Sequence, residues 1–131
     1  ANRLVGSEMC IRDRPGYFNI PKPYYGFEHV DLVTAHGNNC KGHYFQWLQS
    51  NFPDWKKFFG PENELAHNYS CRQGYRTAVP EEFYPTAFVE KKANEYFNAL
   101  NDDKPFISFV SFPDPHHPFT PPGKYWDMYN P

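Results

Sequence analysis

The chain has 131 residues, of which 20% are aromatic and 14 are proline, and its formal net charge is -2. This length is enough for one folded domain, and the composition predicts a core of aromatic rings joined by rigid loops. Acidic and basic residues are mixed along the chain, which argues against nucleic acid and membrane surfaces as partners. No apolar run approaches the roughly 18 residues of a membrane span, and no signal-peptide pattern is present.

The first residues differ in character from the rest of the chain. Residues 5–14 (VGSEMCIRDR) resemble a peptide that arises when sequencing-adapter DNA is translated, and no helical or strand period runs through residues 1–14. We therefore expect residues 1–14 to be an artefactual leader, with an ordinary flexible terminus as the alternative. Three prolines within residues 15–25 then predict an extended connecting segment.

Two short elements are expected before residue 53. Residues 29–35 (HVDLVTA) alternate in polarity, are rich in β-branched side chains and end at a Gly-Asn turn signal, so they predict a short strand. Residues 43–50 (HYFQWLQS) place Tyr44, Trp47 and Leu48 at positions i, i+3 and i+4. This spacing predicts a short amphipathic helix with an aromatic face.

The order of the later elements favours an α/β fold. A further helical turn is expected over residues 53–59, and residues 60–80 have no clear period, which predicts a long surface excursion, with disorder as the alternative. An amphipathic helix is expected over about 85–101. Residues 106–112 (FISFVSF) form a nearly continuous apolar run, typical of a strand buried on both faces of a parallel sheet. Helix, short loop and buried strand make half of a βαβ unit.

The candidate site follows this predicted strand. Ligands of open α/β sheets bind beyond the carboxyl ends of the strands, and here that position is a stiff loop, PDPHHPF, over residues 113–119. We expect the loop to hold His116 and His117 in a defined direction. Lys124 follows closely enough to border the same pocket, together with Tyr125, although both could instead cover the edge of the sheet.

Other polar residues have simpler interpretations. Asp114, in an Asp-Pro context, is expected to shape a turn and not to bind a metal. The remaining histidines follow no recognised ligand spacing, so we expect ordinary loop histidines at these positions: His29, His36, His43 and His67. The three cysteines form neither an even framework nor a C-x-x-C pair, so unpaired thiols are expected. They are Cys10, Cys40 and Cys71.

The stretch from Phe109 to Pro131 (FVSFPDPHHPFTPPGKYWDMYNP) strongly resembles the strand and loop of sulfatases that carry a P-H-x-P-F pattern. The earlier stretch YYGFEHVDLVTAHG also resembles bacterial sulfatases, so the resemblance covers roughly residues 16–131. It implies a partial alkaline-phosphatase-like α/β sandwich, with a parallel-type buried strand and flanking helices. Residues 15–131 would then be an internal fragment of a sulfatase catalytic domain.

The resemblance implies hydrolysis of sulfate esters by a formylglycine made from cysteine or serine, with a Ca²⁺ or Mg²⁺ ion polarising the sulfate. His116 matches the family histidine that contacts the ester near its leaving oxygen, whereas His117 falls at the variable position. We take His116 as catalytic, and His117 and Lys124 as substrate-binding. The family's nucleophile motif, C-x-P-S-R, and its metal carboxylates are absent here, so we expect no metal ligands in this chain and no activity from it alone.

Two alternative functions stay open. A related phosphodiesterase or phosphonate monoester hydrolase would share the fold and a similar loop. A non-catalytic carbohydrate-binding module could use the tryptophans to stack on sugar rings. Such a module should fold and bind glycans as the isolated chain, whereas a piece of a sulfatase should aggregate through unsatisfied sheet edges. For the sulfatase, the expected partner is a small-molecule or carbohydrate sulfate ester, and the resemblance suggests a periplasmic or secreted location.

Overall fold

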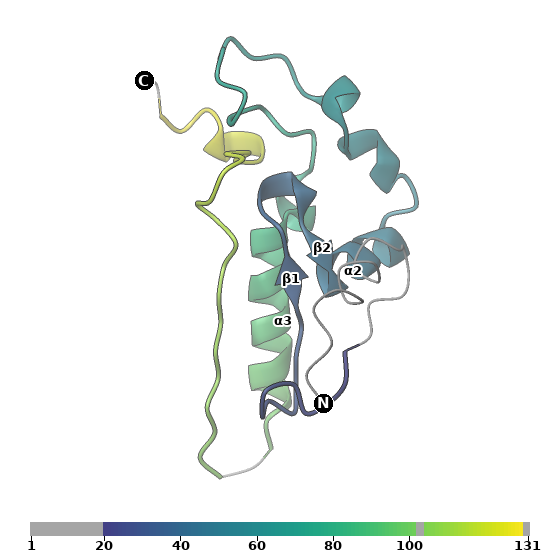
Figure 1. Cartoon of the computed structure of the whole chain (residues 1–131), viewed down its shortest axis with the longest axis vertical. Coiled ribbons are helices and arrows are strands. Elements are labelled where there is room, and N and C mark those ends of the chain that lie inside the picture. The colour runs from purple at the N-terminus through teal and green to yellow at the C-terminus, as the bar shows by residue number, and fades with distance from the viewer. Residues whose placement is uncertain (1–19, 102–103, 130–131) are drawn as a thin grey trace.

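In a computed structural model, which describes residues 20–101 and 104–129, the chain combines helices with one small antiparallel sheet (Figure 1). This arrangement is compatible with part of an α/β fold. The predicted leader, residues 1–14, lies outside the described residues. The elements follow in the order β1 (Val33–Thr34), η1 (Gly37–Asn39), β2 (Lys41–Gly42), α2 (His43–Asn51), η2 (Trp55–Phe58), η3 (Pro61–Asn63), η4 (Glu81–Phe83), α3 (Pro85–Ala99) and η5 (Gly123–Tyr125).

The predicted strand over residues 29–35 is confirmed only in part. β1 pairs antiparallel with β2, with Val33 opposite Gly42 and Thr34 opposite Lys41. The connection between them turns through Gly37, whose φ of +56° lies in the left-handed region that favours glycine. The sheet is therefore a small two-stranded ribbon, and the residues just before β1 run extended in line with it (Figure 1).

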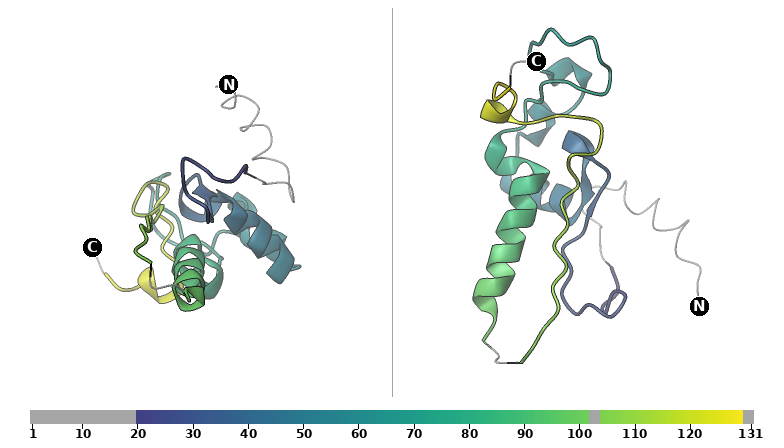
Figure 2. Two further views of the ribbon diagram at one scale, coloured as in Figure 1. Left: turned by 90° about the horizontal axis from the view of Figure 1, so that it is seen from below. Right: turned by 90° about the vertical axis from the view of Figure 1, so that its left-hand side faces the viewer.

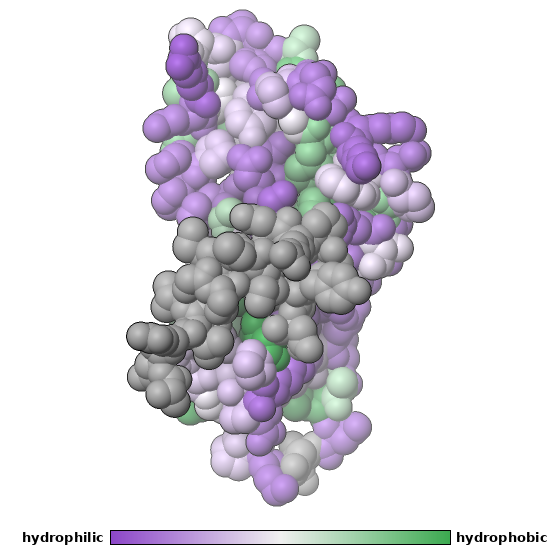
Figure 3. All heavy atoms as spheres, turned by 45° about the vertical axis from the view of Figure 1, so that its right-hand side comes forward, coloured by the Kyte–Doolittle hydropathy of each residue, from purple (hydrophilic) through white to green (hydrophobic). Residues whose placement is uncertain are grey.

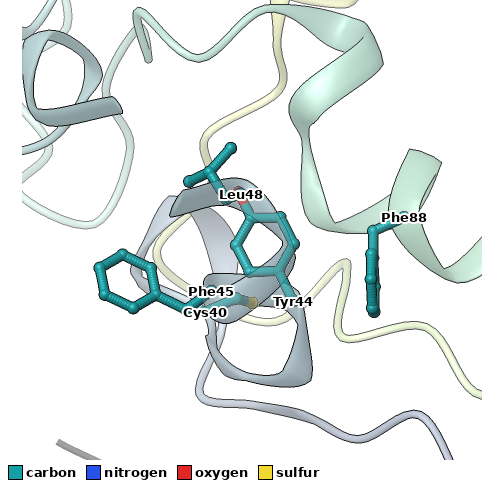
Figure 4. Packing of buried hydrophobic residues seen from close by; sticks show 5 residues of the cluster. All are labelled: Cys40, Tyr44, Phe45, Leu48 and Phe88. Atoms are coloured by element: carbon teal, nitrogen blue, oxygen red, sulfur yellow. The ribbon is translucent and has the colours of Figure 1, made fainter. Parts of the chain in front are cut away.

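The predicted helix over residues 43–50 is confirmed as α2, and it carries the core. Tyr44, Phe45 and Leu48 are buried and pack with Cys40 and Phe88 (Figure 4). The ring of Phe88 in α3 contacts that of Tyr44, with centroids 5.7 Å apart in an edge-to-face arrangement. The predicted aromatic core is thus the interface between α2 and α3. After α2, η2 forms the expected further turn.

The predicted helix over residues 85–101 is confirmed as α3, with Pro85 at its first position, where proline lacks no needed donor. Only its first half is well covered: Phe88 is buried, whereas Phe97 near the other end is 40% exposed. On the face seen in Figure 3, hydrophilic side chains predominate among the described residues. None of the described helices has the length and apolar character that crossing a bilayer requires.

The prediction of a buried strand at residues 106–112 is wrong for this chain. The segment runs extended along α3 (Figure 1), but it belongs to no strand and its side chains are exposed, 86% in the case of Ile107. A strand buried on both faces needs neighbouring strands and covering layers. The described chain offers only the β1–β2 ribbon as sheet, so the apolar sequence is present without the neighbours that would bury it.

The two extended segments, residues 29–34 and 104–112, run in the same direction along α3 (Figures 1 and 2). Their carboxyl ends therefore lie at the same end of the molecule. Residues 60–80 form the predicted surface excursion. An isolated bridge between Leu65 and Arg76 closes it internally, and a second bridge, between Gly74 and Phe119, joins it to the segment that follows the two histidines. The loops that follow the two extended segments meet at this end.

Candidate functional site

The loop with the predicted catalytic histidine meets the turn that follows β1. The imidazole of His116 stacks on that of His36, with centroids 3.7 Å apart and planes 18° from parallel. The His117 ring lies 4.3 Å from that of His116 on the same loop. Nδ1 of His36 also lies 3.4 Å from the carbonyl oxygen of Pro113. Three imidazoles therefore gather where the two extended segments end.

The hydrogen bond of His116 defines which nitrogen faces outward. Its Nδ1 lies 2.6 Å from the carbonyl oxygen of His117, and a carbonyl only accepts, so Nδ1 carries the hydrogen of this bond. Nε2 is then left for a ligand: it accepts when the ring is neutral and donates when the ring is protonated. The side chain is exposed, so this nitrogen can be reached from solvent.

Asp114 lies in a turn, and its side chain is hydrogen-bonded to the start of α3. The Thr86 hydroxyl donates to Oδ2 of Asp114 at 3.1 Å. Burial raises the pKa of the Asp114 carboxyl, while the hydroxyls of Thr86 and Tyr84 and the nearby His36 act in the opposite direction. The carboxylate thus fixes the beginning of the histidine loop to α3.

A buried polar network fixes the end of the same loop. Thr120 accepts the backbone N–H of Asn38 at 3.0 Å and shares a hydrogen bond of 2.9 Å with the Tyr84 hydroxyl. The Asn38 side chain donates to Thr77 at 3.2 Å and accepts from the hydroxyl of Tyr75. Because buried polar groups are costly to leave unpaired, this network specifies how the loops around residues 36–40 and 118–120 sit together.

Gly37 makes this close approach possible. A Cβ at this position would lie 2.6 Å from the carbonyl oxygen of Pro118 and 2.9 Å from Oγ1 of Thr120. Both distances are shorter than side chains tolerate, so a residue with a Cβ would push the histidine loop away. The glycine therefore allows His36 to reach His116.

A pocket of about 810 Å³ lies beside His116, which forms part of its lining. Its walls come from η4, the first turns of α3 and the loop through η5, and they include His116, Phe119 and Tyr125. Four carboxylates also line it: Glu81, Glu82, Glu90 and Asp114. Tyr125 borders the pocket, as one of its two sequence-based interpretations expected.

Lys124 is held by an acidic partner. Its Nζ lies 3.3 Å from Oε2 of Glu81, and its backbone N–H donates to Oε1 of the same residue at 3.0 Å. These bonds lower the pKa of Glu81 and raise that of Lys124. A substrate-binding role for Lys124 stays a prediction, and in the described structure its charge faces Glu81.

Of the other residues considered from the sequence, only His36 joins the site within the described part of the chain. Cys40 is a free, buried thiol whose pKa burial raises to about 12, and Cys71 is free and exposed. Within the part of the chain that the structure describes, no three His, Cys, Asp or Glu side chains group to hold a metal. His29 and His67 lie elsewhere, whereas His36 belongs to the site. Its spacing in sequence gives no signal, because its partner is 80 positions away.

Comparison with known proteins points to sulfatases as the class. No family model matches the chain, and no solved structure gives a significant match. The chain is 30% identical to an ulvan-active sulfatase of Formosa agariphila over 135 aligned residues, which cover 98% of this chain and 24% of that protein. It is 27% identical to an arylsulfatase of Klebsiella aerogenes over 62 residues, which cover 47% of this chain and 13% of that protein.

The chain is therefore sulfatase-like, and it spans about a quarter of the length of the ulvan-active relative. Both relatives carry the name of a hydrolase, and neither is named a phosphodiesterase, a phosphonate hydrolase or a binding module. The two similarities therefore support hydrolase activity at the level of the class.

Proposed function

We propose that this chain is part of a sulfuric ester hydrolase in which His116 contacts the ester near its leaving oxygen. The observation that carries the proposal is the similarity over 98% of the chain to a sulfatase, combined with the exposed, stacked His116 where two co-directional extended segments end. The longer protein that would contain this chain is called the parent protein below. By the same similarity its location would be the periplasm or the extracellular space.

The fold of the parent protein would be an alkaline-phosphatase-like α/β sandwich. Residues 106–112 supply the supporting observation, because they are mostly apolar, extended and exposed. In a larger sheet their side chains would be covered, and their backbone groups would pair with neighbouring strands. The chain studied alone is expected to aggregate through this segment.

The parent protein would also supply the groups that this chain lacks. Neither Cys40 nor Cys71 lies in the C-x-P-S-R pattern, and the described residues do not fit a metal site. A formylglycine would provide an oxygen nucleophile, and a Ca²⁺ or Mg²⁺ ion would neutralise sulfate charge. His116 would donate a proton from Nε2 to the departing oxygen, because its Nδ1 already bonds to the His117 carbonyl.

The substrate class is a carbohydrate or small-molecule sulfate ester. The relative that matches most of the chain is named for activity on ulvan, which makes ulvan oligosaccharides the first substrate to test. Small aryl sulfates follow from the second relative's name.

Measurement of inorganic sulfate released by the parent protein from both substrates tests the proposal. His116→Ala is expected to lower kcat by roughly 10²–10⁴-fold, the usual contribution of a general acid. His29→Ala is the matched control, because His29 is an exposed histidine that stacks on Tyr96, away from the site. Equal activity of the two variants would refute the role of His116, and no sulfate release by the unmodified parent would refute the function.

A further inference from the structure

The pocket beside His116 has the size of a ligand site but the wrong charge for sulfate. Its volume of about 810 Å³ lies within the range of small-molecule sites, roughly 300–1,000 Å³. Carboxylates of Glu81, Glu82 and Glu90 line it, and the nearby Lys124 is already paired with Glu81. An anionic group inside this pocket would meet like charges at short range.

The rings on its walls favour a ligand that has an apolar face. Phe119 and Tyr125 are half exposed, at 50% and 46%, and both line the pocket. Exposed aromatic faces offer apolar area that is already ordered, and the prolines around them keep the loop rigid, so binding costs little conformational entropy. The neighbouring carboxylate oxygens of Glu82 and Glu90 accept hydrogen bonds from hydroxyl groups. Aromatic faces beside hydrogen-bond acceptors suit a sugar ring.

We infer that this pocket binds the alcohol half of the ester as an uncharged, hydroxyl-rich sugar unit. His116 lines the pocket, while one face of its ring is covered by His36. A sugar in the pocket would therefore bring its ester oxygen next to the imidazole of His116. The assignment of this sugar to a sulfate ester rests on the proposed function, whereas the sugar subsite rests on the pocket itself.

Calorimetric binding of unsulfated sugars to the parent protein tests the subsite without relying on activity. The probes are neutral, amino and uronic-acid oligosaccharides, with spermidine as a cation that carries no hydroxyl groups. Neutral oligosaccharides are expected to bind, and Tyr125→Ala to weaken binding by roughly fivefold, as the loss of one aromatic contact predicts. Tyr129→Ala is the control, because Tyr129 is 80% exposed and does not line the pocket.

Kinetics separate failure of this inference from failure of the proposed function. Tyr125→Ala and Glu82→Gln are expected to raise KM for an oligosaccharide sulfate by roughly fivefold, whereas the control Tyr129→Ala should leave this KM within about twofold. Sulfate release that is insensitive to both variants, binding of spermidine alone, or binding of no sugar would overturn the subsite. Sugar binding without hydrolysis of any sulfate ester would overturn the function and leave the subsite standing.

Discussion

Replacement of Gly37 by alanine tests whether the close contact between two loops builds the site. The new methyl group would lie 2.6 Å from the carbonyl oxygen of Pro118, and a φ of +56° is strained for alanine. The left-handed backbone costs about 1–2 kcal/mol and the crowding about 1–3 kcal/mol more. Gly37→Ala should therefore destabilise the protein by roughly 2–5 kcal/mol and separate His36 from His116.

Gly26→Ala provides a matched control. Gly26 also has a positive φ, +88°, but nothing lies within 4 Å of the position its Cβ would occupy. Its substitution should cost only the backbone strain, about 1–2 kcal/mol, with kcat unchanged. Urea unfolding and sulfate release of the parent protein measure both effects. We expect kcat of Gly37→Ala to fall on the order of 10–100-fold through misplacement of His116. Equal stability and equal kcat for the two variants would refute the reasoning.

Three further predictions concern the buried core, the pH dependence of stability and the reactivity of the cysteines. Phe88→Ala should lower the free energy of unfolding by about 3–5 kcal/mol and Phe97→Ala by much less, as read from urea midpoints, because Phe88 is buried and Phe97 is 40% exposed. The pKa of Asp114 is raised on folding, so the folded state holds this proton more tightly, and the carboxyl should reduce stability as pH rises from about 3.8 through its folded pKa. The free energy of unfolding of Asp114→Asn, compared with that of the unmodified protein, should then increase as pH rises through this range. A difference between the two proteins that does not change with pH would contradict this. Iodoacetamide at pH 8 should modify Cys71 much faster than Cys40, whose burial raises its pKa to about 12, and equal labelling by peptide mass spectrometry would exclude that burial.

The sequence predicts the parts of this fold that depend on local spacing. The buried face of α2 follows from the spacing of Tyr44 and Leu48, and the start of α3 follows from Pro85. The state of residues 106–112 could not be predicted in the same way. Their apolar side chains indicate a buried strand, but burial depends on neighbouring strands, and those are not formed by the described residues.

The candidate site shows the same division. Location after an apolar run and the surrounding prolines point to both His116 and His117, because these signals concern nearby residues, and the resemblance to the sulfatase P-H-x-P-F pattern then singles out His116. His36 could not be selected, since its stacking depends on a turn at Gly37 and a network through Thr120, which is remote in sequence. The acidic pocket likewise joins η4 to the loop around residue 125, and no local pattern connects those segments.

Dependence of the rate on the leaving group tests most directly whether His116 serves the departing oxygen of a sulfate ester. The measurement compares kcat/KM of the parent protein and of His116→Ala with a carbohydrate sulfate and with 4-nitrophenyl sulfate. A sugar alkoxide needs a proton to depart, whereas 4-nitrophenolate leaves readily without one. We expect a loss of roughly 10²–10⁴-fold for the carbohydrate sulfate and a much smaller loss for the aryl sulfate. Equal losses for both substrates, or no hydrolysis of either by the unmodified protein, would contradict the account.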